Sequence, residues 1–202
     1  PAYYIPGVSV LSGYYSSMME SIILWFGSDI FGIAETIDTA SNGSGDRLIS
    51  FVSMYTNLIL ALLGCIIWSA ADFRRKSYNK LLTYFSVYIR YYLAATLLSY
   101  GFSKIFTNQF SELGLMDLLK PYGDSSPMGL MWNFMEYSDS YTIFSGISEA
   151  LGGALLLWRR TTLLGALFTV GVMLNVFMMN MSYDIPVKLY SAHLMLMGVF
   201  LL

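Results

Sequence analysis

Cysteine and histidine are almost absent, with one of each among the 202 residues. A single cysteine excludes an internal disulfide, a CxxC redox pair and a cysteine metal cage. Cys65 lies in an apolar run, where we expect it to act as a small membrane-facing hydrophobe. The single histidine has no close carboxylate pattern around it, so the sequence predicts no metal site.

Charge is also scarce. Charged residues make up 12% of the chain, about half of the ~25% that is typical of a soluble domain. Hydrophobic residues make up 56%, and the mean hydropathy is +0.57. This is more apolar surface than one soluble core can bury, and no basic face suited to nucleic acid is present. The composition therefore predicts an all-α, polytopic transmembrane helical bundle whose surroundings are the lipid bilayer.

The apolar residues fall into five long stretches. We expect five membrane spans within a bundle of residues 51–202, at residues 51–71, 81–104, 141–158, 161–181 and 187–202. The second stretch, Leu81 to Phe106, would reach about 39 Å as a helix, enough for a hydrocarbon core of about 30 Å. The last stretch is at the lower limit for a span, and the sequence stops inside it, so we expect further sequence on at least one side.

The first 50 residues form an acidic segment that we expect to lie outside the membrane. Within it, Met18 to Ile33 is apolar but too interrupted to span, which is typical of an interfacial or re-entrant helix. We expect a second short external helix from Pro127 to Tyr137, because Ser126 followed by proline is a good helix start. The polar turn Ser41 to Asp46 lacks the strand and the Lys-Ser/Thr ending of a phosphate-binding loop, and we interpret it as a plain loop.

Only two charges lie in the membrane interior of the expected spans, away from the span ends: Arg90 and Glu149. Arg90 is ten residues from Lys80, and Glu149 is ten residues from Arg159. If both basic clusters mark the same membrane face, each charge is about 15 Å deep. We therefore predict a buried pair of Arg90 and Glu149. Such a pair could be a structural device that fixes helix register, or a ligand-binding or proton-handling pair.

Each of these two stretches presents one distinctive helical face. On the second stretch, a face with three/four spacing carries Arg90, Leu93, Leu97, Tyr100 and Lys104. On the third stretch, a face of mostly small residues carries Thr142, Ser145, Gly146, Glu149, Gly152 and Gly153. Because small faces let helix backbones approach closely, we expect the two stretches to enclose a polar seam.

Aromatic and titratable side chains add two further hypotheses. His193 has the one side chain whose ordinary pKa is near neutrality, and it shares a helical face with Tyr190. It is interpreted as either a hydrogen-bonded packing residue or a catalytic group. A tyrosine cluster on the second stretch could line a pocket for a flat apolar ring, or could serve helix packing; it consists of Tyr84, Tyr88, Tyr91, Tyr92 and Tyr100.

The order of these residues resembles the DoxX family of small bacterial membrane proteins. The resemblance rests on an arginine within a span, then Tyr100-Gly101 and Lys104, then Glu149 followed by Gly152-Gly153 and a leucine run closed by basic residues. It covers residues 84–202, and Ser182 to His193 is similar to a flavobacterial-type branch. The resemblance implies a four-helix core in the bacterial inner membrane. In some members it implies a membrane subunit of thiosulfate:quinone oxidoreductase or of another redox complex.

Two functions remain open from the sequence. One is a non-catalytic accessory, scaffold or assembly subunit that docks onto other membrane-complex subunits through its outer loops. The other is a membrane subunit that binds a quinone or similar lipophilic ligand, with hydrogen bonds or protons supplied by Arg90, Tyr100, Lys104, Glu149 and His193. We expect no catalytic activity of the chain's own and no cofactor apart from a quinone, since no cysteine pair, haem ligand pair or flavin fingerprint is present.

The basic residues predict the topology. Arg74 to Lys76, Lys80 and Arg159-Arg160 occupy two short connections on one side, which we expect to be cytoplasmic. In a Cys65→Ser background, Asp124→Cys should react with a membrane-impermeant thiol reagent added outside intact cells, and Ser77→Cys should react only after permeabilisation. Labelling of position 77 from outside, with position 124 spared, would reverse the assignment.

Overall fold

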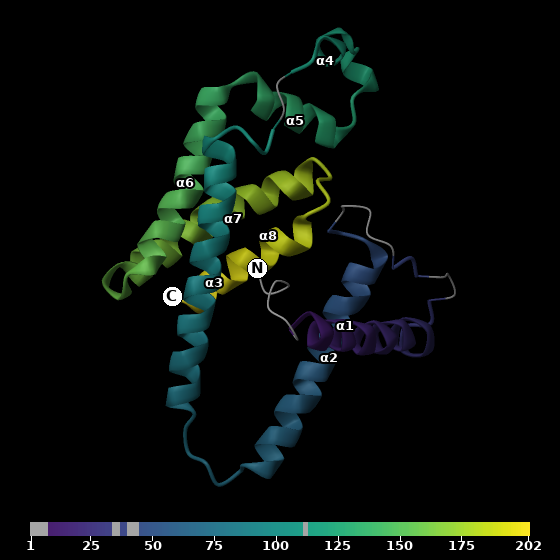
Figure 1. The fold of residues 1–202 in the computed structure, drawn as a ribbon, viewed down its shortest axis with the longest axis vertical. Coiled ribbons are helices and arrows are strands. Elements are labelled where there is room, and N and C mark those ends of the chain that lie inside the picture. The colour runs from purple at the N-terminus through teal and green to yellow at the C-terminus, as the bar shows by residue number, and fades with distance from the viewer. Residues whose placement is uncertain (1–7, 34–36, 40–44, 111–112) are drawn as a thin grey trace. The chain divides into compact units, whose positions relative to one another are not determined.

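The computed structural model describes residues 8–33, 37–39, 45–110 and 113–202 (Figure 1). These residues contain helices and no strand, which confirms the all-α prediction for the part of the chain described. The chain divides into two compact units, Pro1–Lys76 and Ser77–Leu202. The division suggested by composition, at residue 50, therefore falls inside the first unit. Most of the expected Ser41 to Asp46 turn lies outside the described residues.

The first unit contains α1 (Val8–Trp25), a short π-helical segment η2 (Phe26–Ile30) and α2 (Leu48–Ala71). The helix expected from Met18 begins earlier, at Val8, because no proline interrupts the backbone hydrogen bonds before Trp25. Helix α2 contains the first expected span. Most of its apolar side chains are exposed, as suits a helix that faces lipid, while Val52 and Thr56 are buried.

The second unit contains four long helices and two short ones. The long helices are α3 (Asn79–Ile105), α6 (Asp139–Leu157), α7 (Thr162–Ser182) and α8 (Lys188–Phe200). The short ones are α4 (Leu115–Leu119) and α5 (Pro127–Tyr137), and the 3₁₀ turns are η3 (Tyr122–Asp124) and η4 (Arg159–Thr161). All four long helices contribute to one apolar core, made of Leu93, Ala94, Leu97, Leu156, Ala166, Met173 and Leu194.

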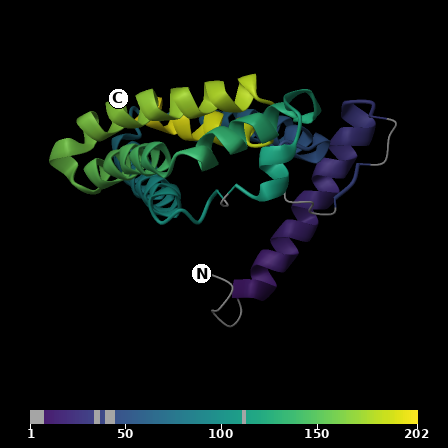
Figure 2. The ribbon, with the colours of Figure 1, turned by 90° about the horizontal axis from the view of Figure 1, so that it is seen from above.

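Helices α3 and α6 lie side by side and antiparallel over much of their length (Figures 1 and 2). A Cβ atom built on Gly101 would lie 2.7 Å from the carbonyl oxygen of Gly146 and 2.7 Å from the amide nitrogen of Ala150. A Cβ atom on Gly146 would lie 2.6 Å from the carbonyl oxygen of Gly101. Backbone therefore packs directly on backbone, which only glycine permits here. This contact fixes the register of α3 against α6.

Three segments are long and apolar enough to cross a membrane: α2, α3 and Arg159–Ser182, which contains α7. The five-span arrangement is not confirmed. Helix α8 has 13 residues, so it reaches only about 20 Å against a hydrocarbon core of about 30 Å. Helix α6, which carries Asp139 and Glu149 together with several serines and glycines, is not among these three segments.

The glycine contact predicts the effect of small substitutions. Gly101→Ala or Gly146→Ala should lower thermal stability in mild detergent, by about 1 to 3 kcal/mol, because the added methyl meets backbone that cannot rotate away. The control is Gly171→Ala on α7, where a Cβ atom would meet nothing within 4 Å. Alanine there should be neutral or slightly stabilising. Equal stability of all three variants would show that the close contact is not formed.

Candidate functional site

A cavity of about 210 Å³ lies where the C-terminal ends of α3 and α7 meet the N-terminal ends of α6 and α8. Its walls are mostly apolar, and include Leu97, Met135 and Met173. Polar residues are also part of the lining, including Lys104 and Glu149. An apolar protein cavity of about 150 Å³ can hold benzene, so this cavity has room for a ligand with a single ring.

Helix α5 covers this end of the second unit. The structure confirms its predicted bounds, and the Ser126 hydroxyl accepts a hydrogen bond from the Gly129 amide as a helix cap. Met131 and Met135 of α5 pack with Phe110 and Ile185 in a second apolar cluster. The Thr142 hydroxyl donates a hydrogen bond of 2.7 Å to the Met135 carbonyl, which ties α5 to α6. These contacts place the side of α5 over the cavity.

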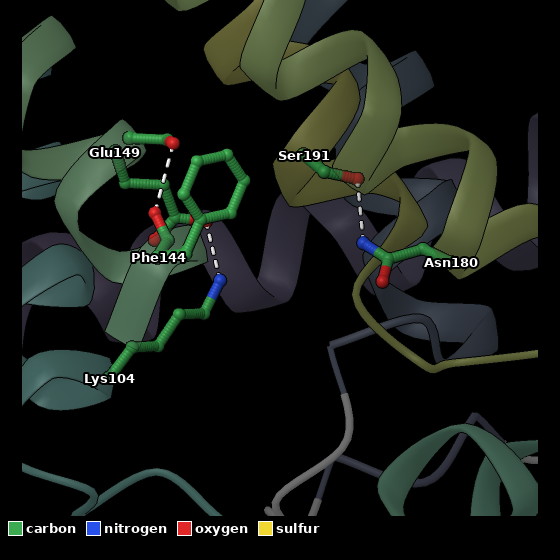
Figure 3. A network of polar contacts seen from close by, with 6 residues as sticks. Lys104, Phe144, Glu149, Asn180 and Ser191 are labelled. Atoms are coloured by element: carbon green, nitrogen blue, oxygen red, sulfur yellow. Dashed lines mark hydrogen bonds and ion pairs between the residues drawn. The ribbon is translucent and has the colours of Figure 1, made fainter. Parts of the chain in front are cut away.

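A buried ion pair forms one wall. The Lys104 ammonium on α3 donates to Oε1 of Glu149 on α6, with 2.5 Å between nitrogen and oxygen (Figure 3). The side chains are 8% and 2% exposed. The second oxygen, Glu149 Oε2, is buried and has no hydrogen-bond partner. A buried acceptor left unsatisfied costs about 1 to 3 kcal/mol, so this oxygen is poised to accept a hydrogen bond.

The predicted pair of Arg90 and Glu149 is wrong. The glycine contact puts Glu149 near Gly101, whereas Arg90 lies about three helical turns away along α3. There, Arg90 Nη1 lies 3.5 Å from the Thr162 hydroxyl. The prediction took Lys80 and Arg159 to lie at the same height in the membrane, and gave Arg90 and Glu149 equal depths because each is ten residues away. In fact α3 extends past the connection between α6 and α7 (Figure 1), so equal counts give different heights.

The structure does not bring the other predicted residues to one place. Tyr100 borders the cavity, and its ring lies 6.0 Å from that of Tyr190. His193 lies on the exposed face of α8, where Nδ1 is 2.6 Å from the Leu189 carbonyl, and it is not part of the cavity lining.

The predicted packing glycines contact different helices. A Cβ atom on Gly152 would meet the Thr169 hydroxyl at 3.1 Å, so this glycine packs on α7. One on Gly153 would meet the Ala94 carbonyl of α3.

A second buried polar contact was missed. The Asn180 side-chain amide donates to the Ser191 hydroxyl at 3.0 Å and to the Val187 carbonyl at 3.4 Å (Figure 3). It joins the end of α7 to the start of α8 at the cavity wall. Trp132 of α5 was missed too, although the methionines at 131 and 135 give α5 an apolar side that had to cover something. Among the described residues, no group of three His, Cys, Asp or Glu side chains could hold a metal ion.

A comparison with known proteins shows the family of this chain. It is 34% identical over 113 residues to an uncharacterized protein, YwoB, of Bacillus subtilis (strain 168), and the match covers 56% of the chain and 71% of YwoB. The chain belongs to the YwoB family. No protein-family model matches it, and no solved structure matches it. The DoxX resemblance therefore stays a prediction for this YwoB-family protein.

The ion pair can be tested by a double-mutant cycle. Lys104→Met should destabilise this YwoB-family protein by about 3 to 5 kcal/mol, because it leaves the Glu149 carboxylate buried without a cation. Adding Glu149→Leu should recover much of that loss, as measured by thermal unfolding in detergent. Lys188→Gln is the control: Lys188 pairs with an Asp184 side chain that is 82% exposed, so its loss should cost no more than about 1 kcal/mol. Coupling of Glu149 to Arg90 instead of Lys104 would contradict the structure.

Proposed function

We propose that this YwoB-family chain is a multi-pass protein of the bacterial inner membrane that binds a small lipophilic molecule in the cavity of its second unit. One observation carries the proposal: Glu149, whose Oε2 is buried without a hydrogen-bond partner, is part of the wall of a mostly apolar cavity big enough for a ring. Three segments with the length and apolarity of membrane spans support the location. In this proposal α6 also crosses, the basic connections face the cytoplasm, and α8 enters the membrane from the outer side.

The chemistry of the walls defines the ligand. The charges of Lys104 and Glu149 cancel, so a charged ligand would leave a net charge in a low-dielectric site at a cost of several kcal/mol. The ligand is therefore neutral. Because Glu149 Oε2 accepts a hydrogen bond, the ligand carries an O–H or N–H donor. The mostly apolar walls, with Leu97 and Met135 among them, suit a hydrocarbon ring.

A quinol has this combination of features. Its ring is flat and apolar, it is neutral, and its hydroxyl could donate to Glu149 Oε2. The DoxX-like pattern of the sequence points to the same class of ligand. The chain would then serve as the quinone-binding membrane subunit of a redox complex, with Lys104, Glu149 and Tyr100 around the ring and with Arg90 and His193 outside the site.

A second candidate is the accessory or scaffold subunit. It is favoured by an exposed apolar surface on α4 and the turn that follows. The side chains of Leu115, Met116, Leu118, Leu119 and Tyr122 are between 62% and 82% exposed. Contiguous exposed apolar side chains of this kind mark contact sites for proteins or membranes. In this candidate the surface docks onto another subunit of a membrane complex.

Ligand binding can be followed by the fluorescence of Trp132, which lines the cavity. With Trp25, Trp68 and Trp158 replaced by Phe, Trp132 is the sole fluorophore. Titration with 2,5-dimethyl-1,4-benzoquinol, which has a single ring and hydroxyl donors, should quench it saturably. Ser145→Phe, which fills the cavity, should weaken binding by at least about tenfold, equivalent to about 1.4 kcal/mol.

The matched control is Ser148→Phe on the same helix, whose hydroxyl bonds the Phe144 carbonyl and which does not line the cavity. It should leave the affinity unchanged. Quenching that does not saturate, or that is the same in the Ser145 and Ser148 variants, would reject the cavity as the binding site. The scaffold candidate would then be the better account.

A further inference from the structure

Among the described residues, no acidic side chain forms an ion pair with Arg90. Its guanidinium bonds the neutral Thr162 hydroxyl, and its central carbon lies 4.7 Å from the centre of the Tyr91 ring. Its Nε is buried without a partner. Residues 77–111 and 150–183 contain no Asp or Glu, and the Glu149 carboxylate is held by Lys104. A half-buried arginine in a membrane-spanning helix normally has a counter-charge.

Two more arginines lie next to Thr162 in the chain. Arg159 and Arg160 form the η4 connection, and Thr162, which bonds Arg90, follows them by two residues. Both arginines are exposed, and no ion pair is seen for either among the described residues. Figure 1 shows this connection at the end of α6 remote from α5, so the acidic residues of the α4 and α5 region are at the other end. Within the described part of the second unit, this end thus has three guanidinium groups and no carboxylate side chain.

We propose that Arg90, Arg159 and Arg160 bind the phosphate of an anionic phospholipid headgroup. Guanidinium groups bind phosphate oxygens with paired hydrogen bonds, and each basic side chain near an anionic leaflet contributes about fivefold in affinity. Exposed apolar side chains beside the arginines favour a lipid over a free phosphate: Leu163 is 58% exposed and Leu164 is 56% exposed. These offer a surface for acyl chains. The proposal does not depend on any ligand in the cavity.

Native mass spectrometry of the full chain in mild detergent tests this site. Phosphatidylglycerol should bind more tightly than phosphatidylcholine with the same acyl chains, and more tightly than glycerol 1-phosphate, which presents the phosphate without a lipid. Arg159→Gln and Arg160→Gln should each weaken phosphatidylglycerol binding by about fivefold. Arg90→Gln should do the same, and Arg90→Lys should retain much of the affinity.

The charge-matched control is Lys120→Gln, which removes one exposed positive charge beyond α4 and should leave the affinity unchanged. Equal binding of phosphatidylcholine would overturn the proposal, as would a Lys120 effect as large as that of the arginines. Equally tight binding of glycerol 1-phosphate would assign the site to a free anion and reject the lipid. If Arg90→Gln does not fold, the Arg159→Gln and Arg160→Gln variants still test the proposal, because these exposed side chains make no packing contribution to the core.

Discussion

The direct backbone contact of α3 with α6 at Gly101 and Gly146 is the constraint on which the second unit depends. Each glycine places its carbonyl where a side chain on the other would stand, so the two helices have one register available. That register places Lys104 beside Glu149 and Arg90 beside Thr162 at the start of α7. The buried ion pair is therefore a consequence of glycine packing. A shift by one helical turn would leave two buried charges apart, at a cost far above that of a surface pair.

Much of the helical architecture could be predicted from local sequence. The stretch expected at residues 81–104 forms α3 from Asn79 to Ile105, and α5 has the bounds that Ser126 and Pro127 indicate. These features depend on residues that are neighbours in the chain, so the sequence expresses them directly. The start of α1 was not predicted, because the first turns of that helix are rich in tyrosine and serine and show no clear apolar period.

The site was predicted in part, and its error has a physical cause. Tyr100, Lys104 and Glu149 were expected in a polar seam, and all three border the cavity. The partner assigned to Glu149 was wrong, because depth was counted from the basic clusters while register is set by glycine contacts farther along the helices. The cavity itself depends on how α5 folds back over the helix ends, through Thr142 and Met135. That tertiary contact leaves no periodic pattern in the sequence.

Methionine gives the cavity a property that the glycine contact lacks. Met131, Met135, Met173 and Met179 line it, and the thioether side chain is unbranched, polarizable and free to change rotamer. On one side the cavity is bounded by helices locked backbone to backbone, and on the other by side chains that can repack around differently shaped molecules. The wall formed by Lys104 and Glu149 is thus selective for the polar group of a ligand, and the methionine wall tolerates different ligand shapes. Its ligands should share a donor group and can differ widely in the substituents of the ring.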